Sequence, residues 1–215
     1  MNLPELKIGK LVAQVPIIQG GMAIRLSTAP LAAAVANEGG IGLIAASGMG
    51  LDELRKEIRM ARELTGGKGI IGINAMVAAR QFLDLITTAA EEGIDLIVAG
   101  AGFSRDIFAV GKKYGVEVVP IVSSARLAQT AEKLGASAVV VEGTEAGGHL
   151  GTQQSIKEIL PEVIEAVNIP VIAAGGAVDG NDVAELLKLG ANGVQMGSRF
   201  AASEESNAAP ALKEF

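Results

Sequence analysis

The chain switches between short, continuously apolar runs and longer stretches in which apolar residues recur every three or four positions. The short runs do not alternate with polar residues, so both faces of each predicted strand are buried, as in a parallel sheet covered by helices. Eight strands are predicted, at residues 15–19, 41–46, 70–74, 96–99, 116–122, 136–142, 169–174 and 193–196.

The stretches between these strands have helical spacing. In residues 51–64, for example, Leu51, Leu54 and Ile58 share one face while charged residues occupy the other. Helices are predicted at residues 31–37, 51–64, 81–92, 106–114, 125–134, 156–167 and 181–189.

One unit, a helix end followed by a glycine and a buried strand, recurs at residues 91–97, 113–119, 133–139 and 188–194. Eight strands with intervening helices predict an α/β fold, a (β/α)8 TIM barrel. An open, doubly wound sheet is the alternative, and it requires a reversal of strand order that a sequence does not display. Residues 200–215 hold only a weak helical pattern and Pro210. The barrel is therefore expected to lack its C-terminal cap and its last helix.

Composition narrows the classes of function. The 215 residues are 49% hydrophobic and 20% charged, as in a globular domain with an extensive core. The net charge is −6 and aromatic residues make up 3%, which argues against a nucleic-acid partner. The absence of cysteine excludes disulfides, thiolate metal ligands and a cysteine nucleophile. We find no signal peptide, no run long enough to cross a membrane and no metal constellation, so we expect a cytoplasmic protein.

Chemically useful groups gather where predicted strands end. The strand at 136–142 ends at Glu142, and a glycine-rich loop follows that contains His149, the one histidine of the chain. Imidazole titrates near neutral pH, which makes His149 the default general acid or base. The structural alternative is a strand-to-helix turn that needs glycine, with a bystander histidine.

Two further strand ends carry glycines: Gly175 and Gly176 after one, and Gly197 with Ser198 after the next. In barrels the last two loops of this kind commonly bind phosphate through backbone N–H groups, and two ordinary turns are the alternative. Asn74, Gln19 and Gln195 also lie in or at the ends of apolar strands. Buried amides need partners, which either a ligand or a neighbouring loop must supply.

Taken together, these segments resemble the nitronate monooxygenase family, also called 2-nitropropane dioxygenase, which shares its fold and motifs with FMN-dependent type II enoyl-acyl-carrier-protein reductases. The resemblance covers essentially the whole chain, in order, and its most specific element is Glu145–Gly151. The matching segments are Pro16–Met22, Gly72–Met76, Ala99–Gly102, Glu142–Gly151, Ile169–Gly176 and Gly193–Phe200.

The resemblance implies an FMN-binding TIM barrel over residues 1–199 and the truncated start of a C-terminal segment over residues 200–215. It also implies an oxidoreductase with FMN at the mouth of the barrel, and a role for each candidate residue. The FMN phosphate would lie on Gly175, Gly176, Gly197 and Ser198. The flavin ring would lie near Gly21, Met22, Asn74 and Gln195, with Glu142, Gly147 and Gly148 close by. His149 corresponds to the active-site histidine of the family.

Several functions stay open. The first is oxidation of alkyl nitronates by dioxygen through the flavin. The second is reduction of an enoyl thioester or a quinone, with NADH or NADPH as co-substrate at the same FMN site. Outside this class stand a flavin-free phosphate-binding barrel, such as an aldolase or isomerase, and an inactive cofactor-binding fragment. Family members continue well beyond residue 215, which puts enclosure of the small-molecule substrate and contacts of a homodimer in doubt.

Overall fold

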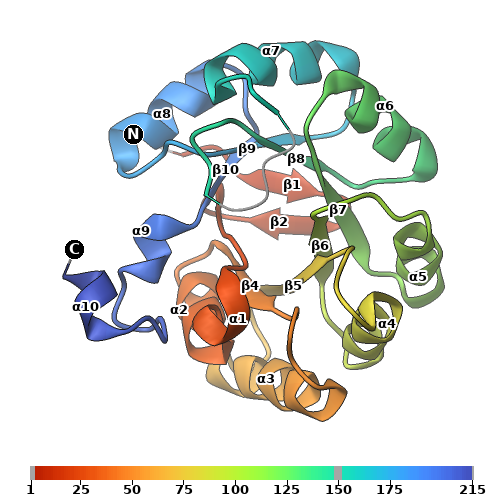
Figure 1. Ribbon diagram of the computed structural model, residues 1–215, viewed down its shortest axis with the longest axis vertical. Helices are drawn as coiled ribbons and strands as arrows, with labels where there is room; N and C mark the ends of the chain where they lie inside the picture. The colour runs from red at the N-terminus through yellow and green to blue at the C-terminus, as the bar shows by residue number, and fades with distance from the viewer. Residues whose placement is uncertain (1–2, 148–151, 215) are drawn as a thin grey trace.

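The computed structural model describes residues 3–147 and 152–214, in which eight parallel strands close into a barrel (Figure 1). The order around the barrel is β10-β3-β4-β5-β6-β7-β8-β9, and β10 pairs with β3 through Val194 and Ile17. This closure confirms the predicted TIM barrel and rules out the open sheet. The strands are β3 (Ile17–Gln19), β4 (Ile41–Ala45), β5 (Ile70–Met76), β6 (Leu96–Gly100), β7 (Glu117–Val122), β8 (Val139–Glu142), β9 (Val171–Ala174) and β10 (Gly193–Met196).

Seven helices connect consecutive strands and surround the barrel (Figure 1). They are α2 (Ala29–Asn37), α3 (Leu51–Leu64), α4 (Phe82–Glu91), α5 (Asp106–Tyr114), α6 (Ala125–Leu134), α7 (Ile156–Ala166) and α8 (Gly180–Lys188). Three four-residue helices complete the described chain: α1 (Ala23–Leu26), α9 (Ser198–Ala201) and α10 (Pro210–Lys213). None of the helices in the described ranges is both long and apolar enough to span a membrane.

The expected bounds hold to within a few residues, and the exceptions have local causes. The strands expected from residues 15 and 169 begin instead at Ile17 and Val171, directly after Pro16 and Pro170, which have no N–H to donate to a ladder. Conversely, β5 runs on to Met76, so Asn74 lies inside the strand and not at its end.

The core is arranged in two layers. Inside the barrel, Ile18, Leu43, Val98 and Ile172 belong to one buried cluster. Outside it, apolar faces of the helices pack on the strands in two further clusters. The packing of α2 on β4 is so close that a Cβ on Gly42 would overlap the backbone of Ala32, so the contact requires glycine there.

The amino end of the barrel carries an element that the sequence patterns did not predict. Strands β1 (Leu6–Ile8) and β2 (Leu11–Ala13) form an antiparallel hairpin that turns at Gly9, where φ is +54°. Leu6 and Ile8 are 1% and 0% exposed and join the cluster inside the barrel, so the hairpin closes this end. Two strands of three residues each produce no long apolar run, which explains why the pattern missed them.

The interval between β10 and β3 differs from the other seven. Within the described residues it holds the short α9 and α10 instead of a full-length helix, and Figure 1 shows both beside α2. An apolar groove of about 260 Å³ remains there, lined among others by Val15, Ile17, Leu31, Val35 and Phe200.

Candidate functional site

Parallel pairing brings the described candidate residues to one end of the barrel, since every strand presents its carboxyl end there. Residues from five strands contribute to this edge. They are Gly21 and Met22 after β3, Asn74 in β5, Glu142 at the end of β8 with Gly147 in the following loop, Gly175 and Gly176 after β9, and Gln195, Gly197 and Ser198 in and after β10. Gly148 and His149 lie outside the described residues, so their place at this edge stays a prediction.

The loop that follows β3 packs tightly against groups from two other strands. A Cβ on Gly21 would overlap the side chain of Asn74, and one on Gly197 would come within 3.6 Å of Sδ of Met22. The N–H of Gly20 donates to the carbonyl oxygen of Met196 (2.9 Å). The three strands β3, β5 and β10 thus meet at the mouth through Gly21, Asn74, Met22 and Gly197.

The two buried glutamines at this edge are in opposite situations. Gln19 is 0% exposed, accepts a hydrogen bond from Leu43 N (3.0 Å) and donates one to Ser27 Oγ (3.0 Å), so a neighbouring loop satisfies it. Gln195 is 8% exposed, and its Oε1 has no hydrogen-bond partner among the described residues. A buried acceptor without a partner is costly, and at the mouth of a barrel it points to a ligand that donates a hydrogen bond.

Glu142 ends β8 as a half-buried carboxyl group. Burial raises the pKa of Glu142 above its ordinary value, because removal from water disfavours the charged form. The group can therefore hold its proton at higher pH than an exposed glutamate.

Glu145, three residues further on, has a structural role. Its Oε2 accepts a hydrogen bond from Ile156 N (3.0 Å), and the N–H of Thr144 donates to Gln154 O (3.0 Å). The carboxylate therefore satisfies a free N–H group at the start of α7, where a negative charge is also favourable.

The loops after β8, β9 and β10 follow one another around the carboxyl edge of the barrel, because these strands are neighbours. Gly175 has φ of +108°, and a Cβ there would come within 2.8 Å of Ala146 N, so the loops after β8 and β9 are in direct contact. Gly176, with φ of +77°, is exposed, as is Ser198 at the start of α9. Strands β9 and β10 are neighbours, with Ala174 opposite Gln195. The two glycine-bearing loops therefore leave adjacent strands, as a shared phosphate site would require.

Sequence patterns missed Ser27, which organises the β3 loop. Its Oγ accepts hydrogen bonds from Met22 N (2.9 Å) and from Gln19, and donates to Gly20 O (3.3 Å). The pair Ser27–Thr28, just ahead of the α2 start, resembles an ordinary helix-start signal and gives no hint of this role.

The fold is a (β/α)8 barrel, and the described candidate groups gather at the carboxyl edge of its strands. The chain belongs to the nitronate monooxygenase family, whose model, described as nitronate monooxygenase, matches residues 5–95 and 71–215.

Relatives and solved structures agree with this family. A probable nitronate monooxygenase of Staphylococcus aureus (strain Newman) is 34% identical over 244 residues, covering 93% of this chain and 68% of the relative. A protein of Rhodococcus jostii (strain RHA1) named (3aS,4S,5R,7aS)-5-hydroxy-7a-methyl-1-oxo-octahydro-1H-indene-4-carboxyl-CoA dehydrogenase is 35% identical over 200 residues, 93% of this chain and 56% of that protein. The chain thus spans little more than half the length of the latter.

Two solved structures are similar to this chain. FabK from Thermotoga maritima aligns with a TM-score of 0.89 and 41% identity, over 94% of this chain and 64% of that chain. Nitroalkane oxidase from Streptomyces ansochromogenes aligns with a TM-score of 0.85 and 28% identity, over 94% and 70%.

Proposed function

We propose that this chain is the FMN-binding barrel of an oxidoreductase that oxidises alkyl nitronates with dioxygen. The observation that carries the proposal is the buried, unpartnered Oε1 of Gln195 at the mouth of a barrel of this family. Oxidised flavin has a ring N–H that could donate to such an acceptor. The close approach of the Gly21 backbone to Asn74 agrees with a planar ligand lying on main chain in place of bulky side chains.

Two groups of residues would hold two different parts of the cofactor, its phosphate and its ring. Backbone N–H groups at Gly175, Gly176, Gly197 and Ser198 would bind the phosphate, because such groups suit an anion. Gln195, Asn74, Gly21 and Met22 would border the flavin ring, with Glu142, Gly147 and Gly148 beside it. When bound, FMN would supply the one-electron oxidation of the nitronate anion, with dioxygen as the final electron acceptor, and these residues would hold and orient the cofactor. His149 would orient or protonate the substrate.

The first experiment is an absorption spectrum of the purified protein before and after incubation with FMN. A flavin spectrum that survives gel filtration supports the cofactor assignment. A protein that stays colourless contradicts it and favours the flavin-free phosphate-binding barrel. With the loaded protein, oxygen uptake on addition of ethyl or propyl nitronate then tests the reaction.

His149→Ala is expected to retain FMN and to slow nitronate oxidation by about 10²-fold or more, the usual scale for a general acid or base. Unchanged turnover would remove His149 from the reaction.

A second candidate, NAD(P)H-dependent reduction of an enoyl thioester or a quinone, is favoured by the 41% identity to FabK. It predicts that NADH or NADPH bleaches the flavin without oxygen, and that a crotonyl thioester or a quinone restores its colour. Oxygen uptake with nitronates and no bleaching by either nucleotide would decide for nitronate oxidation. A small-molecule substrate is common to both candidates, and a homodimer is a further proposal that gel filtration tests.

A further inference from the structure

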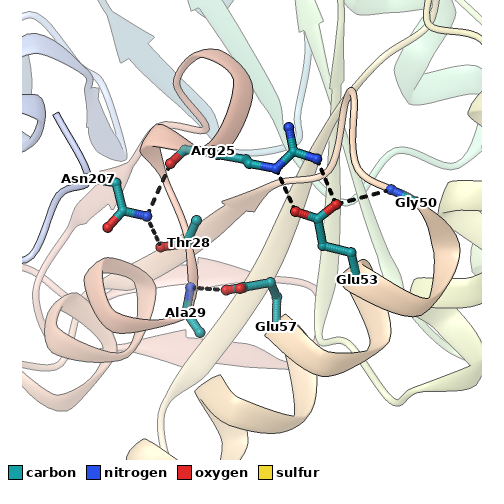
Figure 2. Close-up of polar contacts among 7 residues, drawn as sticks. All are labelled: Arg25, Thr28, Ala29, Gly50, Glu53, Glu57 and Asn207. Carbon is teal, nitrogen blue, oxygen red and sulfur yellow. Dashed lines mark hydrogen bonds and ion pairs between the residues drawn. The ribbon is translucent and has the colours of Figure 1, made fainter. Parts of the chain in front are cut away.

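The loop of residues 20–28 joins β3 to α2 and carries Gly21 and Met22, which the proposed function places beside the flavin ring. Its inner side is fastened by Ser27, whose Oγ contacts Gln19, Gly20 and Met22. Its outer side is fastened by a separate set of residues, which Figure 2 shows.

The outer side contains a backbone outlier. Arg25 has φ of +61°, in the left-handed region, and it is one of three non-glycine residues with positive φ in the described chain. An arginine there is strained, and such strain persists only where surrounding contacts enforce it. The loop would therefore tend to relax to another conformation if these contacts were lost.

Arg25 is held through its side chain. Its Nε donates to Glu53 Oε1 (2.6 Å) and its Nη2 donates to Glu53 Oε2 (2.8 Å), a bidentate arrangement (Figure 2). Glu53 also accepts from Gly50 N (3.4 Å), so the pair is anchored on the first turn of α3.

Arg25 is also held through its backbone, by a residue 182 positions away in the sequence. Asn207 Nδ2 donates to Arg25 O (3.2 Å) and to Thr28 Oγ1 (3.0 Å), and Asn207 N donates to Leu26 O (3.4 Å). Asn207 lies between α9 and α10, and Lys213 Nζ secures this segment by donating to Ser206 O (2.7 Å).

We propose that Arg25, Glu53 and Asn207 form a clamp that positions the 20–28 loop for FMN. The inference rests on the proposed function. The clamp holds the loop on its outer side, while Gly21 and Met22 contact Asn74 and Gly197 at the mouth. Loosening the clamp lowers the fraction of molecules whose loop can accept the cofactor, and the apparent affinity falls by that fraction.

The test compares matched substitutions. Arg25→Gln removes the clamp's ion pair, and Arg59→Gln removes a similar bidentate pair, Arg59–Glu92 (2.7 and 2.8 Å), from the outside of α3. Arg25 and Arg59 are 53% and 68% exposed. Asn207→Ala removes the amide contacts of the clamp, and Asn37→Ala removes a comparable bond to Leu64 O (3.3 Å). Arg25→Lys tests partial rescue.

Two measurements are made on each variant: hydrogen exchange over residues 20–28 in the FMN-free protein, and the Kd for FMN from quenching of flavin fluorescence. Arg25→Gln and Asn207→Ala are each expected to speed exchange and to weaken FMN by about threefold, the scale of exposed ion pairs, and the double variant by about tenfold. Arg25→Lys is expected to fall between wild type and Arg25→Gln. Both control variants should match wild type.

The outcomes separate the clamp from the proposed function. Faster exchange with a raised Kd supports the clamp. Hydrogen exchange at the wild-type rate in the clamp variants overturns it. Faster exchange with an unchanged Kd also overturns it, because these residues would then stabilise the loop locally without affecting FMN binding. A wild-type protein that fails to bind FMN overturns the proposed function, and exchange then decides whether the three residues position the loop.

Discussion

The two ends of the barrel are built from the same strands in opposite ways. At the amino end the β1–β2 hairpin buries Leu6 and Ile8, and Glu117 accepts hydrogen bonds from Lys10 N (3.1 Å) and Ser137 Oγ. At the carboxyl end Gln195 Oε1 has no partner among the described residues, and burial raises the pKa of Glu142.

This difference between the two ends indicates where the folded protein is less stable than it could be. The polar groups described at the amino end are matched within the protein, whereas at the carboxyl end Gln195 Oε1 is not, as at sites that trade stability for function. Substitutions at the amino end should therefore change the free energy of unfolding and leave FMN binding unchanged, whereas substitutions of the proposed FMN-binding residues at the carboxyl end should change FMN binding.

The largest effect is expected for Ile8→Ala in the hairpin. Ile8 is fully buried in the cluster inside the barrel, so the change should lower the free energy of unfolding by about 2–5 kcal/mol. Urea unfolding measures this loss, and the Kd for FMN of the folded variant should stay at the wild-type value. A weakened Kd with unchanged stability would break the comparison between the two ends.

The same substitution can be placed at both ends. A Cβ on Gly193 would come within 2.8 Å of Leu6 Cδ2 at the amino end, and one on Gly21 would overlap Asn74 at the carboxyl end. Gly193→Ala should cost about 1–3 kcal/mol of stability, the usual cost of overpacking. Gly21→Ala should also cost stability, because its Cβ meets Asn74, and should in addition weaken FMN binding by roughly tenfold or more, since 1.4 kcal/mol corresponds to a factor of ten. Equal losses of affinity in both variants would contradict the division.

The two glutamines provide a comparison within one end. Gln195→Met removes an unpartnered acceptor and should raise the stability of the FMN-free protein by about 1 kcal/mol while weakening FMN binding. Gln19→Met leaves the N–H of Leu43 without its acceptor, removes one of the two donors to Ser27 Oγ, and should cost about 1–3 kcal/mol. Thermal unfolding without flavin distinguishes the two, and destabilisation by Gln195→Met would mean that its Oε1 is satisfied in solution.

The smallest effect is expected at Glu142. Burial raises the pKa of Glu142 in the folded protein. Its contribution to stability is therefore fully present below the ordinary pKa of glutamate, and it is lost as the pH rises through the raised pKa of the folded protein. Glu142→Gln should therefore raise the melting temperature at pH 7 and leave it unchanged at pH 4. Glu158 is the control of opposite sign, because hydrogen bonds from Ser155 lower its pKa. Glu158→Gln should lower the melting temperature at pH 7, and a change of the same sign in both variants would contradict the assignment.

The sequence predicted the parts of the fold that local patterns encode. Apolar runs placed the eight barrel strands, and glycines such as Gly115 and Gly135, with φ of +68° and +97°, correctly marked helix ends. The β1–β2 hairpin was not predicted, because strands of three residues are too short to show a recognisable hydrophobic pattern.

The candidate site was predicted less completely, for a physical reason. Gln19 and Gln195 look alike in the sequence, and only the three-dimensional neighbours separate a satisfied amide from an unpartnered one. The hydrogen bond between Asn207 and Arg25 joins residues 182 positions apart, and no local sequence pattern predicts a contact over that distance. The chemistry of Gly148 and His149 stays a prediction, since both lie outside the described residues.

The pairing of β3 with β10 has a consequence for the order of events at the ribosome. Until Val194 has been synthesised, the edge of β3 that will pair with β10 exposes backbone N–H and C=O groups. Leu6 likewise lacks its contact with Gly193 until that residue has been added. The nascent chain must keep its first barrel strand from pairing with a wrong edge while the residues between β3 and β10 are synthesised, so premature association is the misfolding route that this topology favours.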